Sequence, residues 1–198
     1  MSTWIIVPVN PLHKRGSKLK GVLSVDERLE LVLLMLRNML SELALVQEID
    51  EVLVVSRDDQ VIDLAEQYSA LVQRSNPAKL NDALTSAAKR ARRGGADTIV
   101  VLPSNLALLN SADVANLLEM PAQVALCPDN RFDDTNIIML RNMHTFKFQF
   151  GEESFSKHLA EAAKHNEVAQ MAFAESFEFA LKTPADWRQF QKSGRVLA

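Results

Sequence analysis

Short apolar runs alternate with longer stretches of helical periodicity in this chain of 198 residues, and this alternation is the feature that most limits its fold. The apolar runs lie at residues 4–9, 51–55, 71–72, 98–102, 123–127 and 136–140. Strand–helix–strand units of this kind place parallel strands in one sheet and helices on its faces. We therefore predict a single α/β domain over residues 1–198, a three-layer sandwich with a mostly parallel central sheet.

The helical stretches carry start and stop signals. Ser24 and Glu27 have the spacing of a capping box at the start of a first helix, which is predicted to continue to about residue 46. Its broad apolar stripe is typical of a core-facing helix and is wide enough for a subunit interface, so a homodimer is a possible assembly. The other predicted elements are helices at 58–68, 79–93, 154–165 and 184–190 and a strand at 168–173.

The composition of the chain excludes several classes of protein. Its formal net charge is −3, so no polybasic surface for nucleic acid or an anionic membrane is expected. The most apolar later segment, residues 29–40, contains Glu30 and Arg37 and is too short to span a bilayer. The single cysteine, Cys127, is expected to be buried at a strand end and fits a reducing compartment. We therefore expect a cytoplasmic protein without nucleic-acid or membrane partners.

The loop after residues 4–9 is the first candidate for a binding site, because ligands of open parallel sheets bind at the carboxyl ends of the strands. Four cations surround Gly16-Ser17 in this loop, namely Lys14, Arg15, Lys18 and Lys20. Cations and backbone N–H groups in such a loop can hold phosphate oxygens, although the pattern is not that of a Walker A loop. A solvated basic loop is the alternative interpretation.

Two further segments place polar side chains where a base or an anion could bind. Asn81, at the start of the third predicted helix, could present its carboxamide to a base edge or cap that helix. Ser154 and the backbone after Gly151 are expected at the start of the fourth, where Ser154 is either part of an anion site or an ordinary N-cap. Thr135 could add a hydroxyl from a neighbouring strand, and His158 is either a core residue or a hydrogen-bond donor behind the site.

Read in order and with their spacing, these segments resemble one family. The motifs are Val7-Pro8-Val9-x-Pro11-Leu12, Ser17-Lys18-Leu19, Leu80-Asn81-x-Ala83-Leu84, Leu102-Pro103-x-x-Leu106-x-Leu108-Leu109, Thr135-Asn136 and Phe150-Gly151-x-x-Ser154-Phe155-x-x-His158-Leu159. To about Trp187 the chain resembles the 2-phospho-L-lactate, or phosphoenolpyruvate, guanylyltransferases of coenzyme F-420 biosynthesis. The resemblance implies a nucleotide-diphospho-sugar-transferase-like fold.

The resemblance also implies an activity and a set of site residues. GTP and a small phospho-acid would react, the substrate phosphate would attack the α-phosphorus, and pyrophosphate would leave with help from Mg²⁺. Thr135, Gly151 and Ser154 match the positions that bind the phospho-acid. The nucleotide-binding positions are matched by Pro11, Leu12, Lys14, Ser17, Lys18 and Asn81.

The chain departs from the family pattern at the carboxylates that hold the metal. Asn105 stands where the family carries Asp in a Pro-x-Asp-Leu-Pro loop, and Ala180 and Lys182 replace both carboxylates of an Asp-x-Asp-Thr-Pro motif. Lys182 could supply positive charge where the metal would lie, and Asp129, Asp133 or Asp134 could bring carboxylates from another loop. Lys18, Asn105 and Lys182 are thus the expected catalytic residues. The alternative is a catalytically impaired relative that binds a nucleotide or phospho-acid as a sensor or partner subunit.

Overall fold

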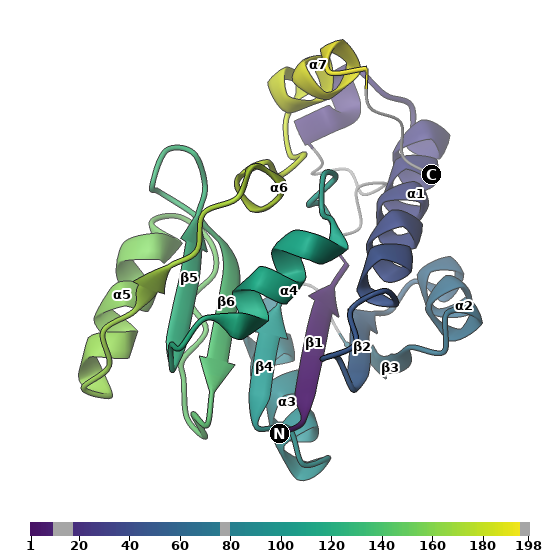
Figure 1. Cartoon of the computed structure of the whole chain (residues 1–198). Helices are drawn as coiled ribbons and strands as arrows, with labels where there is room; N and C mark the ends of the chain where they lie inside the picture. The colour runs from purple at the N-terminus through teal and green to yellow at the C-terminus, as the bar shows by residue number, and fades with distance from the viewer. Residues whose placement is uncertain (10–17, 76–79, 195–198) are drawn as a thin grey trace.

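A computed structural model describes residues 1–9, 18–75 and 80–194, and these residues build one central sheet with helices on both faces (Figure 1). The strands are β1 (Thr3–Pro8), β2 (Glu51–Ser56), β3 (Leu71–Arg74), β4 (Thr98–Val101), β5 (Val124–Pro128), β6 (Thr135–Arg141) and β7 (Gln170–Met171). Their order across the sheet is β3-β2-β1-β4-β6-β5-β7. β6 runs antiparallel to both neighbours and the other pairs are parallel, so the predicted α/β class with a mostly parallel sheet is confirmed.

The two faces of the sheet bury separate hydrophobic cores. Successive strand residues point to opposite faces, so Ile5 of β1 joins one core and Ile6 joins the other. One core contains side chains of α1 (Val25–Leu43), α2 (Asp59–Gln67), α4 (Ser111–Glu119) and α6 (Glu175–Glu178). The opposite core contains side chains of α3 (Leu80–Arg93) and α5 (Ser154–Lys164). These layers form the predicted three-layer sandwich.

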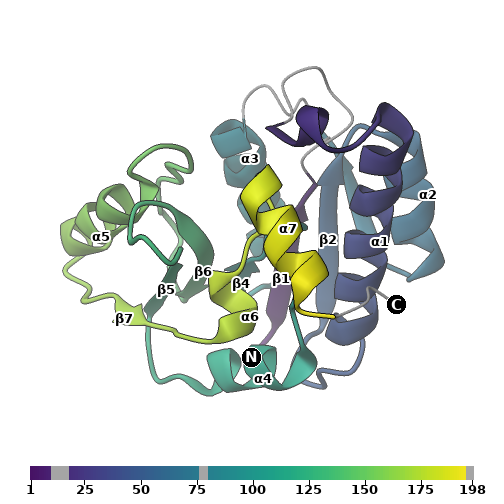
Figure 2. The same ribbon diagram turned by 90° about the horizontal axis from the view of Figure 1, so that it is seen from above.

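A third, smaller core closes the end of the molecule where β1 finishes. It joins Leu19 of the 3₁₀ helix η1 (Lys18–Gly21), Leu31 and Met35 of α1, Phe190 of α7 (Pro184–Lys192), and Leu181, which precedes α7. Seen from above, α7 lies over the carboxyl end of β1 (Figure 2). The chain segments around Lys18 and Lys182, far apart in sequence, are therefore packed at the same end of the sheet.

The start of the first helix agrees with the sequence expectation, whereas several other boundaries differ from it. The predicted capping box is present, since Ser24 Oγ accepts from the Glu27 N–H at 3.2 Å and the Glu27 carboxylate accepts from the Ser24 N–H at 2.7 Å. Helix α1 ends at Leu43, before residue 46, and the strand expected at 168–173 is reduced to β7. Helices α4 and α6 were not expected; α4 starts after Asn110, whose side chain accepts from the Asp113 N–H.

Two expectations about individual features are resolved by the structure. Cys127 is fully buried at the end of β5, and burial raises the pKa of its thiol to about 12, so the group stays protonated. No helix in the described part of the chain combines the length and apolar character needed to cross a membrane.

The end of α3 is fixed by a glycine and by an arginine that binds loop carbonyls. Gly95 has φ +92°, a left-handed conformation suited to glycine, and the Ala96 N–H returns to the Ala91 carbonyl at 3.0 Å as in a Schellman ending. The Arg92 guanidinium donates at 2.7, 2.8 and 2.5 Å to the carbonyl oxygens of Ala96, Asp97 and Met143. Arg92 therefore ties the end of α3 to the start of β4 and to the segment after β6.

Replacing Arg92 by alanine should lower the free energy of unfolding by about 2 kcal/mol, because three carbonyls lose a charged donor. Urea denaturation measures the change. Arg93→Ala is the matched control, since Arg93 is the exposed neighbour, and it should change stability by less than about 0.5 kcal/mol. Equal effects of the two substitutions would contradict the role given to Arg92.

Candidate functional site

The candidate site is a cavity of about 210 Å³ at the edge of the sheet where the parallel strands end. Pro8 at the end of β1 and Asn105 in the loop after β4 line it. Because β6 runs antiparallel, its first residues, Thr135 and Asn136, reach the same edge. The remaining polar lining comes from Asp134, Ser154 and Lys182. This edge is where ligands bind in open α/β sheets.

Thr135 and Ser154 are joined by a buried hydrogen bond, in which the Thr135 N–H donates to Ser154 Oγ at 2.8 Å. Ser154 is the first residue of α5, and the residue at the N-cap position is Glu153, with a left-handed φ of 54° and no capping side chain. The interpretation of Ser154 as an ordinary N-cap is therefore wrong. Its hydroxyl instead joins the start of α5 to the start of β6.

Gly151 completes this side of the cavity. Its φ is +127°, a backbone conformation that residues other than glycine rarely adopt. The Gly151 carbonyl accepts from the Ser154 N–H at 3.1 Å. The glycine thus permits the turn that leads into α5.

His158 lies fully buried behind these hydroxyls. Its Nδ1 is 2.9 Å from Thr135 Oγ1, and its Nε2 accepts from the Gln149 N–H at 2.9 Å. The rings of Phe146 and Phe150 lie with centroids 5.9 and 5.0 Å from the imidazole. Burial lowers the pKa of His158 to about 4, with the charge of Glu161 opposing the shift, so the imidazole is neutral near pH 7.

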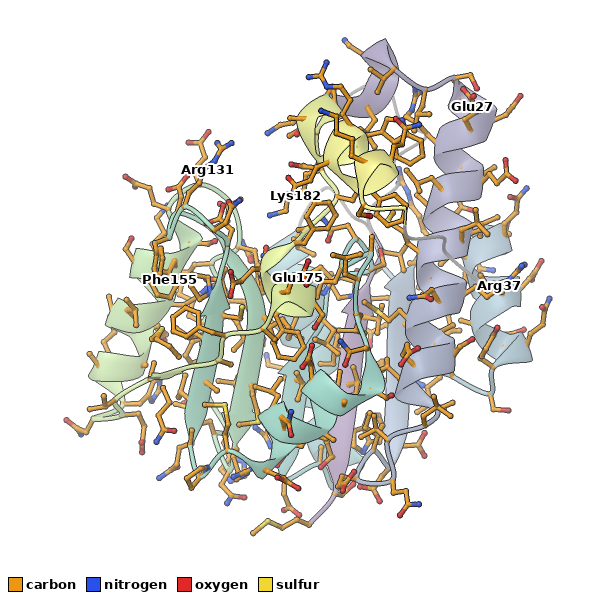
Figure 3. The ribbon with its side chains drawn as sticks, turned by 45° about the horizontal axis from the view of Figure 1, so that its top comes forward. Glu27, Arg37, Arg131, Phe155, Glu175 and Lys182 are labelled. Carbon is orange, nitrogen blue, oxygen red and sulfur yellow. The ribbon has the colours of Figure 1, made fainter. Side chains whose placement is uncertain are left out.

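Lys182 lies in the segment between α6 and α7 (Figure 3), and it lines the cavity. Its Nζ lies 3.3 Å from Asp134 Oδ2 and 3.3 Å from Asn136 Oδ1. The Asn136 amide group donates to the carbonyls of Phe177 and Glu178 at 3.0 and 3.1 Å, which turns its oxygen toward the ammonium. Two acceptors at the start of β6 thus hold this cation in the site.

The backbone at Lys182 is fixed as firmly as its side chain. Asp186 Oδ2 accepts from the N–H groups of Lys182 and Thr183 at 2.9 and 2.7 Å, and Thr183 caps α7 in return. The Leu181 N–H donates to the Asn105 carbonyl at 2.8 Å. Two of the three positions at which the family pattern would carry carboxylates, 105 and 182, are therefore neighbours in space.

The resemblance implies Mg²⁺, but the side chains at the expected positions are not the ligands that this ion prefers. Mg²⁺ prefers carboxylate oxygens, but Asn105 offers a neutral carbonyl, Ala180 offers no side-chain ligand, and Lys182 is itself a cation. Asp134 is the carboxylate among the described lining residues, and it pairs with Lys182. Among residues 1–9, 18–75 and 80–194, no group of three or more His, Cys, Asp or Glu side chains could hold a metal ion.

The carboxylates of the preceding loop do not replace the missing ligands. Asp129 Oδ1 accepts from the N–H groups of Arg131, Asp133 and Asp134 at 3.3, 2.9 and 3.2 Å and so closes the turn between β5 and β6. Asp129 and Asp133 line a neighbouring cavity of about 400 Å³ and not the one that contains Thr135.

Apart from Asn81, the predicted site residues divide into three groups in the structure. Thr135, Gly151, Ser154, Asn105 and Lys182 meet in one cavity. Lys18 lines the neighbouring cavity, which shares Asp134, Gly151 and Lys182 with the first. The predicted phosphate-loop residues Pro11, Leu12, Lys14 and Ser17 lie outside the described residues.

Asn81 does not have the capping role that was one of its two expected roles. It is the second residue of α3 and not its cap. Its carboxamide makes two hydrogen bonds with the Phe150 backbone, donating to the carbonyl at 3.1 Å and accepting from the N–H at 2.8 Å. Asn81 therefore holds the segment that leads to Gly151, and Phe150 itself lines the cavity.

Asn136, His158 and Asp186 contribute to this arrangement but were not assigned to the site from the sequence. Asn136 was part of the Thr135-Asn136 motif, which was the available signal for it. His158 carried a helical-spacing signal relative to Ser154. Asp186 had the capping-box spacing with Thr183, but that spacing indicates a helix start and not a contact with Lys182.

Known structures share the open, mostly parallel sheet of this chain. A protein from Desulfovibrio desulfuricans assigned to the nucleotide-diphospho-sugar transferases has a TM-score of 0.74 at 15% identity, with 98% of this chain and 89% of that chain covered. A 4-diphosphocytidyl-2C-methyl-D-erythritol synthase has a TM-score of 0.69 at 12% identity, covering 98% and 99%. At these identities the likeness concerns the fold, and it confirms the predicted fold class.

Sequence comparison gives the family. The model of the family described as "Guanylyl transferase CofC like" matches residues 3–186, and the chain belongs to this family. The phosphoenolpyruvate guanylyltransferase of Rubrobacter xylanophilus is 34% identical, covering 99% of this chain and 97% of the relative. The 2-phospho-L-lactate guanylyltransferase of Methanocaldococcus fervens is 29% identical, covering 82% and 72%. The family expected from the motifs is confirmed.

The buried imidazole predicts a pH dependence of stability. Since the pKa of His158 falls from its usual 6.5 to about 4 on folding, the unfolded chain binds more protons between these values. Stability should therefore decrease as the pH falls from about 6.5 toward 4, by about 3 kcal/mol from this group. Urea unfolding between about pH 7 and pH 4.5 measures the slope.

His158→Asn should flatten this slope relative to the wild-type chain because the titrating group is removed. His144→Asn, at an exposed position, serves as the control and should leave the slope unchanged. An identical slope in the wild-type chain and in His158→Asn would contradict the assigned burial of a neutral imidazole.

Proposed function

We propose that this chain is a guanylyltransferase that joins GMP from GTP to a small phospho-acid, 2-phospholactate or phosphoenolpyruvate, with release of pyrophosphate. The observation that carries the proposal is the convergence of Thr135, Gly151, Ser154, Asn105 and Lys182 on one cavity. These residues come from four separate segments of the chain. The names of its relatives, which are phosphoenolpyruvate and 2-phospho-L-lactate guanylyltransferases, support the same chemistry.

The phospho-acid is assigned to the side of the cavity formed by β6 and α5. The hydroxyls of Thr135 and Ser154 and the backbone at Gly151 surround the first turn of α5. Hydroxyls, N–H groups and the positive end of a helix dipole are all suited to phosphate oxygens. This side of the cavity can therefore hold the phosphate that acts as the nucleophile.

GTP is assigned to the side that leads toward Lys18. Lys18 lines the neighbouring cavity, and Pro11, Leu12, Lys14 and Ser17 belong to the proposed triphosphate loop that precedes it in the chain. Asn81 remains the proposed contact to the base region. Its carboxamide retains one N–H beyond its two bonds to Phe150.

In the proposed transfer, a phosphate oxygen of the phospho-acid forms a bond to the α-phosphorus of GTP while the bond to the β-phosphate bridge oxygen breaks. Catalysis of such a step is mainly orientation and stabilisation of developing charge. Lys182 and Lys18 supply positive charge, and the Asn105 carboxamide supplies a neutral donor. No step is assigned to Mg²⁺, because the donors present do not match it.

A second candidate function follows from the ion pair of Lys182 with Asp134. An ammonium held at 3.3 Å between Asp134 and Asn136 can bind a phosphate without a metal, so the chain is also suited to act as a nucleotide or phospho-acid sensor or as a partner subunit. Both candidates place the chain in the cytoplasm as one domain over residues 1–198, with a homodimer as the proposed assembly.

Incubation with GTP and either phospho-acid should release pyrophosphate, measured by a coupled phosphate assay with and without Mg²⁺ or Mn²⁺. The absence of pyrophosphate under every metal condition, together with calorimetric binding of GTP in the absence of metal, would exclude the transferase and support the sensor. Activity that disappears on chelation would contradict the role given to Lys182.

Lys182→Met should reduce kcat by about a hundredfold, because it removes a positive charge from the site of transfer. Lys192→Met is the matched control, since Lys192 is exposed at the end of α7 and outside both cavities, and it should leave kcat unchanged. A kcat that is equal for the two variants would remove Lys182 from the mechanism.

Combining Asn105→Asp with Lys182→Asp restores two of the three carboxylates expected from the resemblance. The double variant should acquire activity, or calorimetric GTP binding, that depends on added Mg²⁺ or Mn²⁺, because two carboxylates now face the same cavity. No gain in metal dependence would show that positions 105 and 182 do not form the metal site of relatives.

A further inference from the structure

We infer that His158 is a positioning residue that commits the Thr135 hydroxyl to donate its proton into the cavity. The site then selects a ligand rich in acceptor oxygens, which is the property of an ionised phosphate. The inference rests on the proposed function, because it assigns the selectivity of the same phospho-acid side of the cavity.

The tautomer of His158 follows from its two neighbours. The Gln149 backbone N–H can only donate, and it points at Nε2 from 2.9 Å, so Nε2 must carry a lone pair. A neutral imidazole then has its hydrogen on Nδ1. Nδ1–H therefore donates to Thr135 Oγ1 at 2.9 Å.

This donation determines what the Thr135 hydroxyl does. Because Oγ1 accepts from His158, the hydroxyl proton of Thr135 must point elsewhere, and Thr135 lines the cavity. The hydroxyl proton of Ser154 must likewise point elsewhere, because Ser154 Oγ accepts from the Thr135 N–H at 2.8 Å. Ser154 also lines the cavity. In the described part of the chain neither hydroxyl proton has a protein acceptor at hydrogen-bonding distance.

Two buried hydroxyl donors and the Lys182 ammonium thus line the same cavity. A phosphate group offers several acceptor oxygens and satisfies all of these donors. A ligand group that can only donate, such as an ammonium, would leave a donor facing a donor, and a hydroxyl offers fewer acceptor sites than a phosphate. Selectivity here is a matter of hydrogen-bond direction, and His158 sets that direction.

His158 does not touch the ligand in this arrangement. Both of its nitrogens are used, one by Gln149 and one by Thr135, and the rings of Phe146 and Phe150 pack beside it. It therefore acts through Thr135. Its bond to Gln149 also ties α5 to the segment that leads into Phe150 and Gly151.

The test is a double-mutant cycle read by calorimetry with phosphoenolpyruvate and, separately, GTP. His158→Phe removes the donor and keeps an aromatic ring beside Phe146 and Phe150, so it should weaken phosphoenolpyruvate binding about tenfold, the effect of one lost hydrogen bond. GTP affinity should change less than about twofold, and His158→Asn, which keeps an N–H group near Thr135, should recover most of the loss. In a Thr135→Val background, His158→Phe should cause almost no further loss.

A full tenfold loss in the Thr135→Val background, or an equal loss of GTP affinity, would overturn the inference. His165→Asn, at the C-cap of the same helix and outside the cavity, is the control and should leave phosphoenolpyruvate binding unchanged. If the wild-type chain binds neither phosphoenolpyruvate nor 2-phospholactate, the proposed function fails, and this outcome is distinct from the failure of the inference.

A second measurement does not require any variant to fold. Proton–nitrogen NMR of the ¹⁵N-labelled wild-type chain distinguishes the two imidazole tautomers through the shifts of the ring nitrogens. The His158 ring should carry its hydrogen on Nδ1. A hydrogen found on Nε2 would overturn the inference, because Thr135 would then donate to His158 and not into the cavity.

Discussion

The reversed direction of β6 is the constraint on which the candidate site depends. In a sheet of parallel strands, the carboxyl ends share one edge, and a strand of opposite direction begins at that edge. Register pairs Val101 of β4 with Ile138, so β6 starts beyond the end of β4 and brings Thr135 and Asn136 beside Asn105. Thr135 then contacts Ser154 and His158, while Asn136 contacts Lys182 and the carbonyls of α6.

The sequence predicted the parts of the fold that depend on local pattern. Apolar runs gave the sheet, and the Ser24 and Glu27 spacing gave the start of α1. Helix α4 was not expected; its cap, Asn110, accepts from the Asp113 N–H, without the Glu of a capping box. The predicted site residues Thr135 and Ser154 came from the expected helix start at residue 154 and its neighbouring strand, and Lys182 came from the comparison with the family motif.

The contacts among site residues could not be predicted from the sequence, because they join distant segments. Thr135 and His158 are 23 residues apart, and Asn136 and Lys182 are 46 apart. The role of Ser154 was left open since the left-handed conformation of Glu153 has no signal in the sequence. Asn81 had two expected roles, whereas its bonds to Phe150 depend on how α3 docks against the segment before α5. The direction of a strand and the docking of a helix are determined only when the whole sheet has assembled.

Asp186 links the last helix, α7, to the candidate site, although α7 does not form the phospho-acid side of the cavity. One carboxylate oxygen both starts α7, by accepting from Thr183, and fixes the backbone of Lys182. Helix formation and the placement of the site's cation are therefore the same event, and the site is complete only after the C-terminal segment has folded. Selection for binding then extends to residues such as Phe190, whose packing in the small third core keeps α7 folded although its side chain lies outside the cavity.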